Sequence, residues 1–140
     1  MTEFDLEILT PEKPFFTGKC VSVVVPATDG MMGIMAHHSP MTAAICVGRI
    51  VFTLPDGEIR ICAVTRGMIS VGGDRARILC ESAIAPEDID TEKERLAMQE
   101  AELEMRKMQS YEDYMVFKLA FAKAINRLKV KQYSSIYAEQ

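Results

Sequence analysis

Glycine and proline occur only in the first 86 residues of this chain. The last of eight glycines is Gly73, and the last of six prolines is Pro86. Both residues interrupt regular structure, because glycine permits a positive φ whereas proline fixes φ and lacks a backbone donor. The 54 residues after Pro86 contain neither, which favours long unbroken helices. The sequence therefore predicts a turn-rich domain over residues 1–85 and a helical domain over 86–140, whose function depends on both.

The composition narrows the class of protein. A chain of 140 residues with 49% hydrophobic residues is large enough for one core, with or without an appendage. A net charge of −4 argues against general nucleic-acid binding, and no apolar run approaches the roughly 20 residues that span a bilayer. The N-terminus is acidic where a secretory signal is basic. We therefore expect a soluble cytoplasmic protein that reaches membranes only through partners.

The four cysteines are far apart and have apolar neighbours. None belongs to a C-x-x-C pair, so the spacing supports neither a metal site nor a disulfide framework. We expect Cys20, Cys46, Cys62 and Cys80 to be small buried hydrophobic residues.

The first domain has the pattern of an antiparallel all-β module. Short β-branched or alternating segments are separated by turn signals such as Pro55-Asp56-Gly57 and Gly72-Gly73. The expected strands are residues 4–9, 19–25, 31–35, 42–47, 49–54, 58–64, 68–71 and 75–80. Eight or more strands at this spacing predict a sandwich or barrel.

The second domain has the pattern of a helical hairpin. Pro86 suits a first helical position, and the acids that follow it face the positive end of the helix dipole. We expect this helix to end near Met108. Ser110 and Asp113 resemble a capping box for a second helix that ends near Ile136. The short break between them predicts an antiparallel hairpin about 30 Å long.

Each predicted helix has an apolar face. The second carries Phe117, Phe121, Ile125 and Leu128 at spacings of four, four and three. The first offers Ile89, Leu96 and Leu103 at seven-residue spacing, with Ala97, Ala101, Met105 and Met108 on an adjoining face. Packing within the hairpin and against the sandwich explains these faces better than a cofactor site.

A row of cations follows the second helix. Lys123, Arg127 and Lys131 recur every four residues, on the side opposite the apolar stripe. The row is either a solvated face paired with the acidic first helix or a surface for an acidic protein partner. Because the row is expected opposite the packing seam, it should not easily reach the first helix.

No catalytic motif is present. The sequence lacks a nucleophile elbow, H-E-x-x-H, a Walker loop and a dinucleotide fingerprint. His37 and His38 are the only histidines, and no cysteine or carboxylate lies next to them. A loop position at a contact surface is more consistent with this pair than catalysis or metal binding. We expect neither a metal nor a cofactor.

Several segments in order resemble the epsilon-subunit family of F-type ATP synthases over essentially the whole chain. They are Leu9-Thr10-Pro11-Glu12, Phe15-Phe16-x-Gly18, Val25-Pro26, Asp29-Gly30-x-x-Gly33-Ile34, His38-Ser39-Pro40-Met41, Gly48, Gly67, Ala83, Glu87-Asp88-Ile89-Asp90 and Ala122-Lys123-Ala124-Ile125-Asn126-Arg127-Leu128. The chain lacks an Arg- and Ser-rich transit segment, which favours a bacterial member.

The resemblance implies an N-terminal β-sandwich of about ten strands and a C-terminal helical hairpin. It also implies a non-catalytic rotor subunit at the cytoplasmic face of the membrane, whose sandwich binds the gamma subunit and the c subunits of the membrane ring. Such a subunit couples ion flow to ATP synthesis, with the catalytic residues on other subunits. The hairpin is expected to oppose ATP hydrolysis when it extends along gamma.

The resemblance also assigns contacts to particular residues. Those expected at the membrane ring are Asp29, Gly30, Met31, Met32, His38, Ser39 and Pro40. The cationic row would meet an acidic segment of a catalytic beta subunit when the hairpin extends. Met31 replaces an acid of some relatives, so the ring contact here would be more apolar.

Regulatory ATP binding is expected to be weak or absent. Many bacterial members begin the first helix with Ile/Leu-Asp-x-x-Arg-Ala and bind ATP there. This chain keeps Asp90 but has Lys93 for Arg and Glu94 for Ala. Lysine lacks the planar guanidinium fork, and a further carboxylate repels a polyphosphate. Any residual ATP site would consist of Asp90, Lys93 and Arg127.

Two other functions remain open on the residues alone. The helices suit a generic coiled-coil adaptor unrelated to the rotor, and the histidine pair suits an enzyme. Neither alternative explains the ordered family segments.

Overall fold

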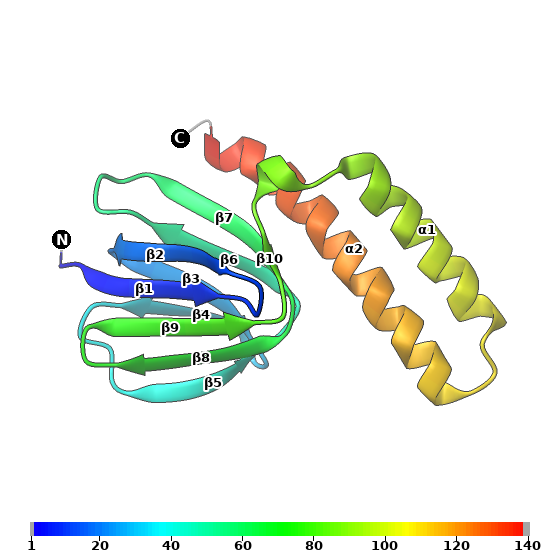
Figure 1. The fold of residues 1–140 in the computed structure, drawn as a ribbon, viewed down its shortest axis with the longest axis horizontal. Coiled ribbons are helices and arrows are strands. Elements are labelled where there is room, and N and C mark those ends of the chain that lie inside the picture. Colours follow the sequence, from blue (N-terminus) through cyan, green and yellow to red (C-terminus); the bar gives the residue numbers. More distant parts are fainter. Residues whose placement is uncertain (1, 139–140) are drawn as a thin grey trace.

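Ten strands and then two long helices form the computed structural model, which describes residues 2–138 and the side chains of residues 2–135 (Figure 1). The strands are β1 (Phe4–Leu9), β2 (Pro14–Cys20), β3 (Ser22–Ala27), β4 (Gly30–Met35), β5 (Met41–Ile45), β6 (Gly48–Thr53), β7 (Ile59–Val64), β8 (Gly67–Gly72), β9 (Arg75–Cys80) and β10 (Ala83–Ile84). The helices are η1 (Pro86–Asp88), a short 3₁₀ turn, α1 (Thr91–Lys107) and α2 (Tyr111–Ala138). The predicted sandwich followed by a helical hairpin is confirmed. Residues 139 and 140 of the expected helical domain lie outside the described residues.

The strands form two halves joined at one corner. One half has the order β10-β7-β6-β3-β4 and the other β5-β8-β9-β1-β2. Between β3 and β5, the register pairs only Ala27 with Ile45. The pairing of β1 with β9 is parallel, so the prediction of a wholly antiparallel module was wrong at this pair. Strands far apart in the sequence are not joined by a tight turn, and nothing local therefore sets their direction.

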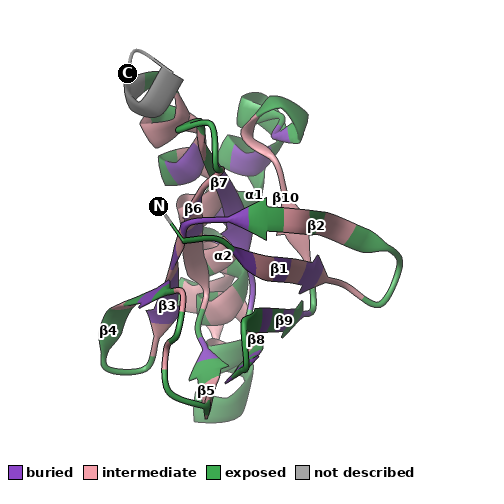
Figure 2. Cartoon of the chain, turned by 90° about the vertical axis from the view of Figure 1, so that its left-hand side faces the viewer, coloured by how far each residue is buried: buried purple, intermediate pink, exposed green. Residues whose placement is uncertain are grey.

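The core lies between the two halves. Buried positions alternate with more exposed ones along β1, β8 and β9, as expected for strands with one face in the core (Figure 2). Large fully buried side chains of this core include Leu6, Ile8, Val23, Val25, Ile34, Ile45, Ile50, Phe52, Ile69 and Ile78.

Strand β7 differs because both of its faces are covered. Cys62 and Val64 lie in the sandwich core, whereas Ile61 and Ala63 lie in a second cluster with Ile89. That second cluster also contains Val130 of α2, so the hairpin packs on the outer face of β7.

Two predicted boundaries in the first domain were wrong. The expected strand 19–25 is divided between β2 and β3, and the chain passes from one to the other at Val21. Pro26 does not end β3 but pairs with Met31 of β4. Proline is tolerated at this position because it lies near a turn, where the absence of a backbone N–H removes little of the hydrogen bonding between the strands.

The first long helix begins later than predicted. Pro86 starts only the short η1 turn, and Ile89 then adopts an extended conformation. Asp90 caps α1 by accepting a hydrogen bond from the backbone nitrogen of Lys93 at 3.1 Å. The predicted cap of the second helix is present, since Ser110 Oγ accepts from the backbone nitrogen of Asp113 at 3.1 Å.

Helix α2 lies between α1 and the sandwich (Figure 1). The two helices pack against each other, and their buried residues include Ala101 of α1 and Ala124 of α2. Leu96 and Leu103, expected to pack within the hairpin or against the sandwich, are 54% and 55% exposed, so that prediction was wrong. Small alanines allow close approach of the two helices, and the larger leucines lie on the outer face of α1.

Three of the four cysteines are buried as expected, but Cys46, which follows the end of β5, is exposed, so the prediction was wrong for this residue. Burial raises the pKa of the Cys20 thiol to about 12 and that of the Cys80 thiol to about 11. Burial raises the pKa of Cys62 as well. These three thiols therefore remain protonated at neutral pH.

Candidate functional site

The cationic row of α2 lies at the junction of the hairpin and the sandwich. Lys123 Nζ is 4.0 Å from Glu81 Oε2, in the segment between β9 and β10. Arg127 Nη1 donates to Glu94 Oε1 of α1 at 3.2 Å. Lys131 Nζ donates to the backbone oxygen of Pro86 at 2.8 Å. One helix face therefore binds the sandwich, the linker and the neighbouring helix.

This arrangement corrects the predicted orientation of the row. We expected the row not to reach the first helix easily, but Arg127 binds Glu94. The expectation treated the hairpin as two helices with free outer sides, whereas α2 is flanked by α1 and by the sandwich. Helical periodicity fixes which residues share a face, but it does not say what covers that face.

The carboxylates opposite the row have different surroundings. Glu94 is buried, with 7% of its side chain exposed. Glu81 is half exposed and also accepts a hydrogen bond from Arg66 Nε at 2.8 Å. The hydrogen bond and the charge of Arg66, with the charge of Lys123, hold the pKa of Glu81 below its usual range. Glu81 therefore presents a full negative charge to Lys123 at neutral pH.

Two further contacts hold α2 on β6. Asn126 Nδ2 donates to the backbone oxygen of Gly48 at 2.7 Å. The guanidinium of Arg49 lies 4.6 Å from the centre of the Tyr133 ring, a cation–π distance. The sequence did not predict these contacts, because Asn126 was noted only as part of a family segment.

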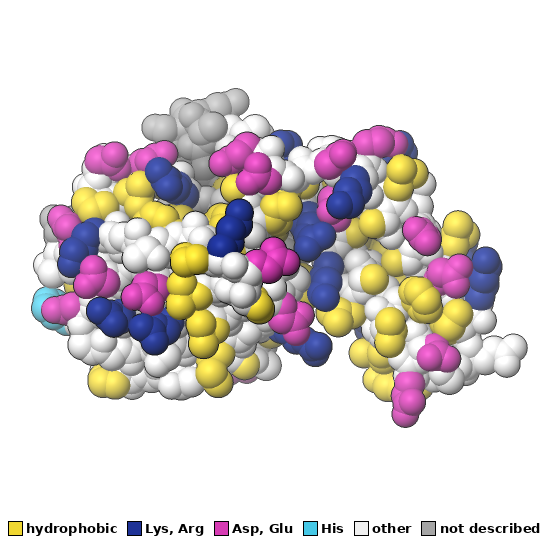
Figure 3. All heavy atoms as spheres, in the orientation of Figure 1, with side chains coloured by type: hydrophobic (Ala, Val, Ile, Leu, Met, Phe, Trp, Pro, Cys, Tyr) yellow, Lys and Arg dark blue, Asp and Glu magenta, His cyan; other side chains and the backbone are white. Residues whose placement is uncertain are grey.

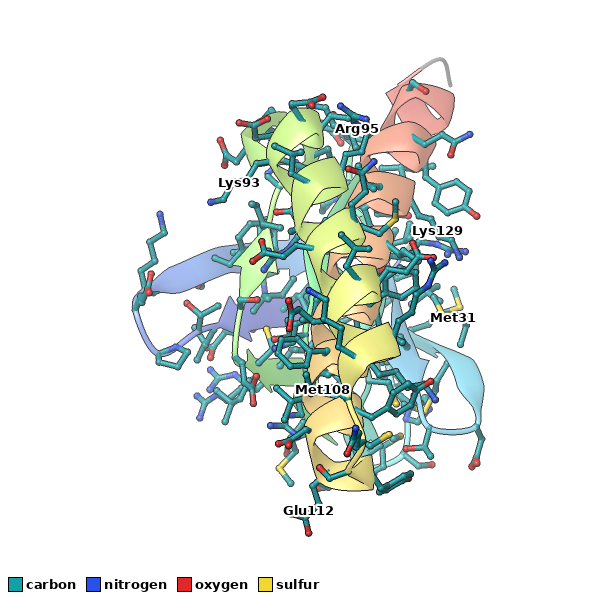
Figure 4. All side chains as sticks on the ribbon, turned by 90° about the vertical axis from the view of Figure 1, so that its right-hand side faces the viewer. Met31, Lys93, Arg95, Met108, Glu112 and Lys129 are labelled. Atoms are coloured by element: carbon teal, nitrogen blue, oxygen red, sulfur yellow. The ribbon has the colours of Figure 1, made fainter. Side chains whose placement is uncertain are left out.

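The possible ATP residues lie around the start of α1, but two of the three have other partners there. Asp90 caps α1, and Arg127 is paired with Glu94. Lys93 is exposed and lies on the side of α1 away from α2 (Figure 4). Weak or absent ATP binding stays a prediction, and the buried carboxylate adds a reason for it.

We expect calorimetric titration of the isolated subunit to show no micromolar ATP binding. A polyphosphate at Arg127 would have to displace Glu94 and then lie beside its charge. The double variant Lys93→Arg with Glu94→Ala restores the family pattern and should bind more tightly. Micromolar binding by the unaltered chain would contradict the prediction.

The residues expected at the membrane ring form two separate groups. Asp29, Gly30, Met31 and Met32 lie at the start of β4, whereas His38, Ser39 and Pro40 follow its end. Gly30, Met31 and Met32 belong to β4 itself, and residues 33–37 separate the two groups along the chain. Met31 is 48% exposed and lies at the edge of the sandwich, in the view from the hairpin side (Figure 4). The ring contact stays a prediction, and only a surface that runs along β4 would contain both groups.

The histidine pair lies in the loop between β4 and β5. His37 is exposed, with a φ of 64°, and its Nδ1 is 3.4 Å from Asp74 Oδ1. His38 Nδ1 is 2.8 Å from the backbone oxygen of Ser39. Within the residues that the structure describes, no three His, Cys, Asp or Glu side chains are grouped as metal ligands.

An apolar hollow lies on the sandwich near the hairpin. A cavity of about 630 Å³ is lined by apolar residues that include Leu9, Pro11, Ala44, Ile45 and Leu79, and also by Arg66 and Glu81. Leu79 and the nearby Met68 are about half exposed. Figure 3 shows hydrophobic side chains gathered where β8 and β9 run. Exposed apolar surface beside a hollow is typical of a protein-binding face, and sequence analysis did not find it.

Comparison with known proteins covers both parts of the chain. The family model for the ATP synthase delta/epsilon chain β-sandwich domain matches residues 3–86, and that for its long α-helix domain matches residues 87–132. The chain therefore belongs to the ATP synthase delta/epsilon chain family.

Bacterial epsilon chains are similar over nearly their full length. That of Caldicellulosiruptor bescii is 34% identical over 132 residues, which cover 94% of this chain and 96% of the relative. That of Ruminiclostridium cellulolyticum is 37% identical over 128 residues, which cover 91% and 95%. Within the family, the chain is an epsilon subunit.

A solved structure shares the fold. A chain of the Euglena gracilis mitochondrial ATP synthase, from the cryo-EM structure of its OSCP/F1/c-ring in rotational state 1, superposes with a TM-score of 0.81. The match has 15% identity and covers 97% of this chain and 82% of that one. Neither α1 nor α2, as far as they are described, has a stretch apolar enough to span a membrane.

Proposed function

We propose that the chain is a non-catalytic rotor subunit of the central stalk, which links gamma to the membrane ring at the cytoplasmic face of the membrane. It couples ion translocation to ATP synthesis, and the catalytic residues belong to other subunits. The proposal is supported by family membership over both domains and by the likeness to a chain of an F1/c-ring complex.

The observation that carries the proposal is the apolar hollow of the sandwich. Leu79 and Met68 are 49% and 51% exposed, next to the cavity lined by Leu9 and Pro11. A rotor subunit must stay attached to its shaft, and a desolvated apolar contact provides such attachment. We assign this face to gamma.

Leu79→Lys is expected to abolish copurification with gamma. The substitution places a charge in the centre of the apolar face, where it would be desolvated without a partner. Ser70→Lys is the matched control. Ser70 is exposed on β8, and its substitution by lysine adds the same charge outside the hollow. Pull-down with tagged gamma measures both variants. Equal capture of the two variants would contradict the assignment, and no capture even of the unaltered chain would favour an unrelated adaptor.

The hairpin is the proposed brake on ATP hydrolysis. When docked, it covers the outer face of β7; when extended along gamma, it would bring Lys123, Arg127 and Lys131 to an acidic segment of a beta subunit. A device of this kind has two states whose balance is set by the contacts that each state makes. The contacts of the docked state are therefore as important as those with the beta subunit.

A further inference from the structure

All three cations of the row have partners inside the chain when the hairpin is docked. The partners are Glu81, Glu94 and the backbone oxygen of Pro86. We propose that Glu94, assisted by Glu81, competes internally for the row: Glu94 of α1 holds α2 within the folded hairpin, Glu81 holds α2 on the sandwich, and both mask cations that a partner would otherwise bind. The identity of the partner that binds the released row depends on the proposed function. The internal contacts of the docked state do not depend on it.

Glu94 is the main competitor because of its burial. Only 7% of its side chain is exposed, and Arg127, which is 28% exposed, is its ion-pair partner. A buried carboxylate is stable as an anion only when it is paired and hydrogen-bonded. Moving α2 away from α1 would leave Glu94 without this partner, so the pair opposes opening of the hairpin, the step that frees α2 to extend.

Glu81 has a smaller part. It is half exposed, lies 4.0 Å from Lys123 and already binds Arg66 at 2.8 Å. Exposed ion pairs of this kind contribute little and are screened by salt. The bonds from Lys131 and Asn126 go to backbone oxygens, so no substitution on the acceptor side removes them.

The competition determines which substitutions are informative. Replacing all three cations by alanine removes contacts of the docked state and of the extended state together, so its effect on hydrolysis is ambiguous. Glu94→Gln is sharper, because it keeps every cation and weakens only the docked state. The released row would then be free to bind an acidic surface.

The test measures the separation of α1 and α2 in the isolated full-length subunit. Spin labels are placed at exposed sites by Gln99→Cys on α1 and Lys129→Cys on α2, in a Cys46→Ser background, and the undocked fraction is the fraction in which α2 has left α1; the other three cysteines are buried. Electron–electron distance measurements should show the undocked fraction of Glu94→Gln rising roughly five-fold or more. The matched control is Glu100→Gln, which removes the same charge from an exposed position of α1 and should leave the distances unchanged.

A charge swap distinguishes loss of the ion pair from misfolding of the variant. Glu94→Arg combined with Arg127→Glu should restore docking, whereas Glu94→Arg alone should not. An undocked fraction of Glu94→Gln equal to that of Glu100→Gln would overturn the inference, as would failure of the swap to restore docking.

Hydrolysis by the assembled ATP synthase separates this inference from the proposed function. Undocking by Glu94→Gln with deeper inhibition of hydrolysis supports both. Undocking with unchanged hydrolysis supports the internal competition and contradicts the brake.

Discussion

Truncation after Ala85 is expected to raise ATP hydrolysis by the reassembled ATP synthase several-fold. The truncated chain keeps all ten strands and loses η1, α1 and α2, and with them the cationic row. If the extended hairpin inhibits by binding a beta subunit, its removal abolishes inhibition at every nucleotide concentration. Phosphate release from ATP under saturating conditions measures the effect.

The truncation also separates the roles of the two domains. Because the apolar hollow near Leu79 belongs to the sandwich, copurification with gamma should persist. Gamma binding is therefore the control for correct assembly. Loss of ion-coupled synthesis without faster hydrolysis would confine the function to the sandwich and contradict the brake.

Gly67→Ala is expected to destabilise the sandwich severely. Gly67 begins β8 opposite Cys80 of β9, and a Cβ there would lie 2.0 Å from the backbone oxygen of Leu79 and 2.7 Å from the Cα of Cys80. Backbone atoms cannot rotate away as a side chain can, so the strands must separate. We expect a loss of about 3 kcal/mol in the free energy of unfolding, which lowers the Tm by roughly 10 °C.

The opposite end of the same strand provides the control. A Cβ on Gly72 would have no atom within 4 Å. Gly72→Ala should therefore change the free energy of unfolding by no more than about 0.5 kcal/mol. Thermal unfolding followed by circular dichroism measures both variants, and equal Tm values would show that the β8–β9 contact yields more easily than its geometry indicates.

Local signals predicted the architecture but not every boundary. The loss of glycine and proline after Pro86 separated strands from helices, and alternation identified strands such as Phe4–Leu9. The division at Val21 was missed, because an unbroken β-branched run contains no turn residue there. The parallel pairing of β1 with β9 was missed because pairing between distant strands depends on the whole sheet.

The site was predictable residue by residue but not as an arrangement. The four-residue spacing found Lys123, Arg127 and Lys131, yet the partner of Arg127 is 33 positions away in the sequence. Leu96 and Leu103 matched a heptad but are exposed, whereas the alanines Ala101 and Ala124 are buried. Spacing describes one helix, and the assembly of three layers decides which of its faces is covered.

The double burial of β7 has a consequence for the free subunit. When α2 leaves, Ile61 and Ala63 lose the cover of Val130, and an apolar strip of the sheet meets water. Hydration of that strip disfavours extension until another protein surface takes the helix's place. Extension of the hairpin therefore always exposes this apolar strip of the sandwich. Isolated subunits whose hairpin is held in the extended state should self-associate through it.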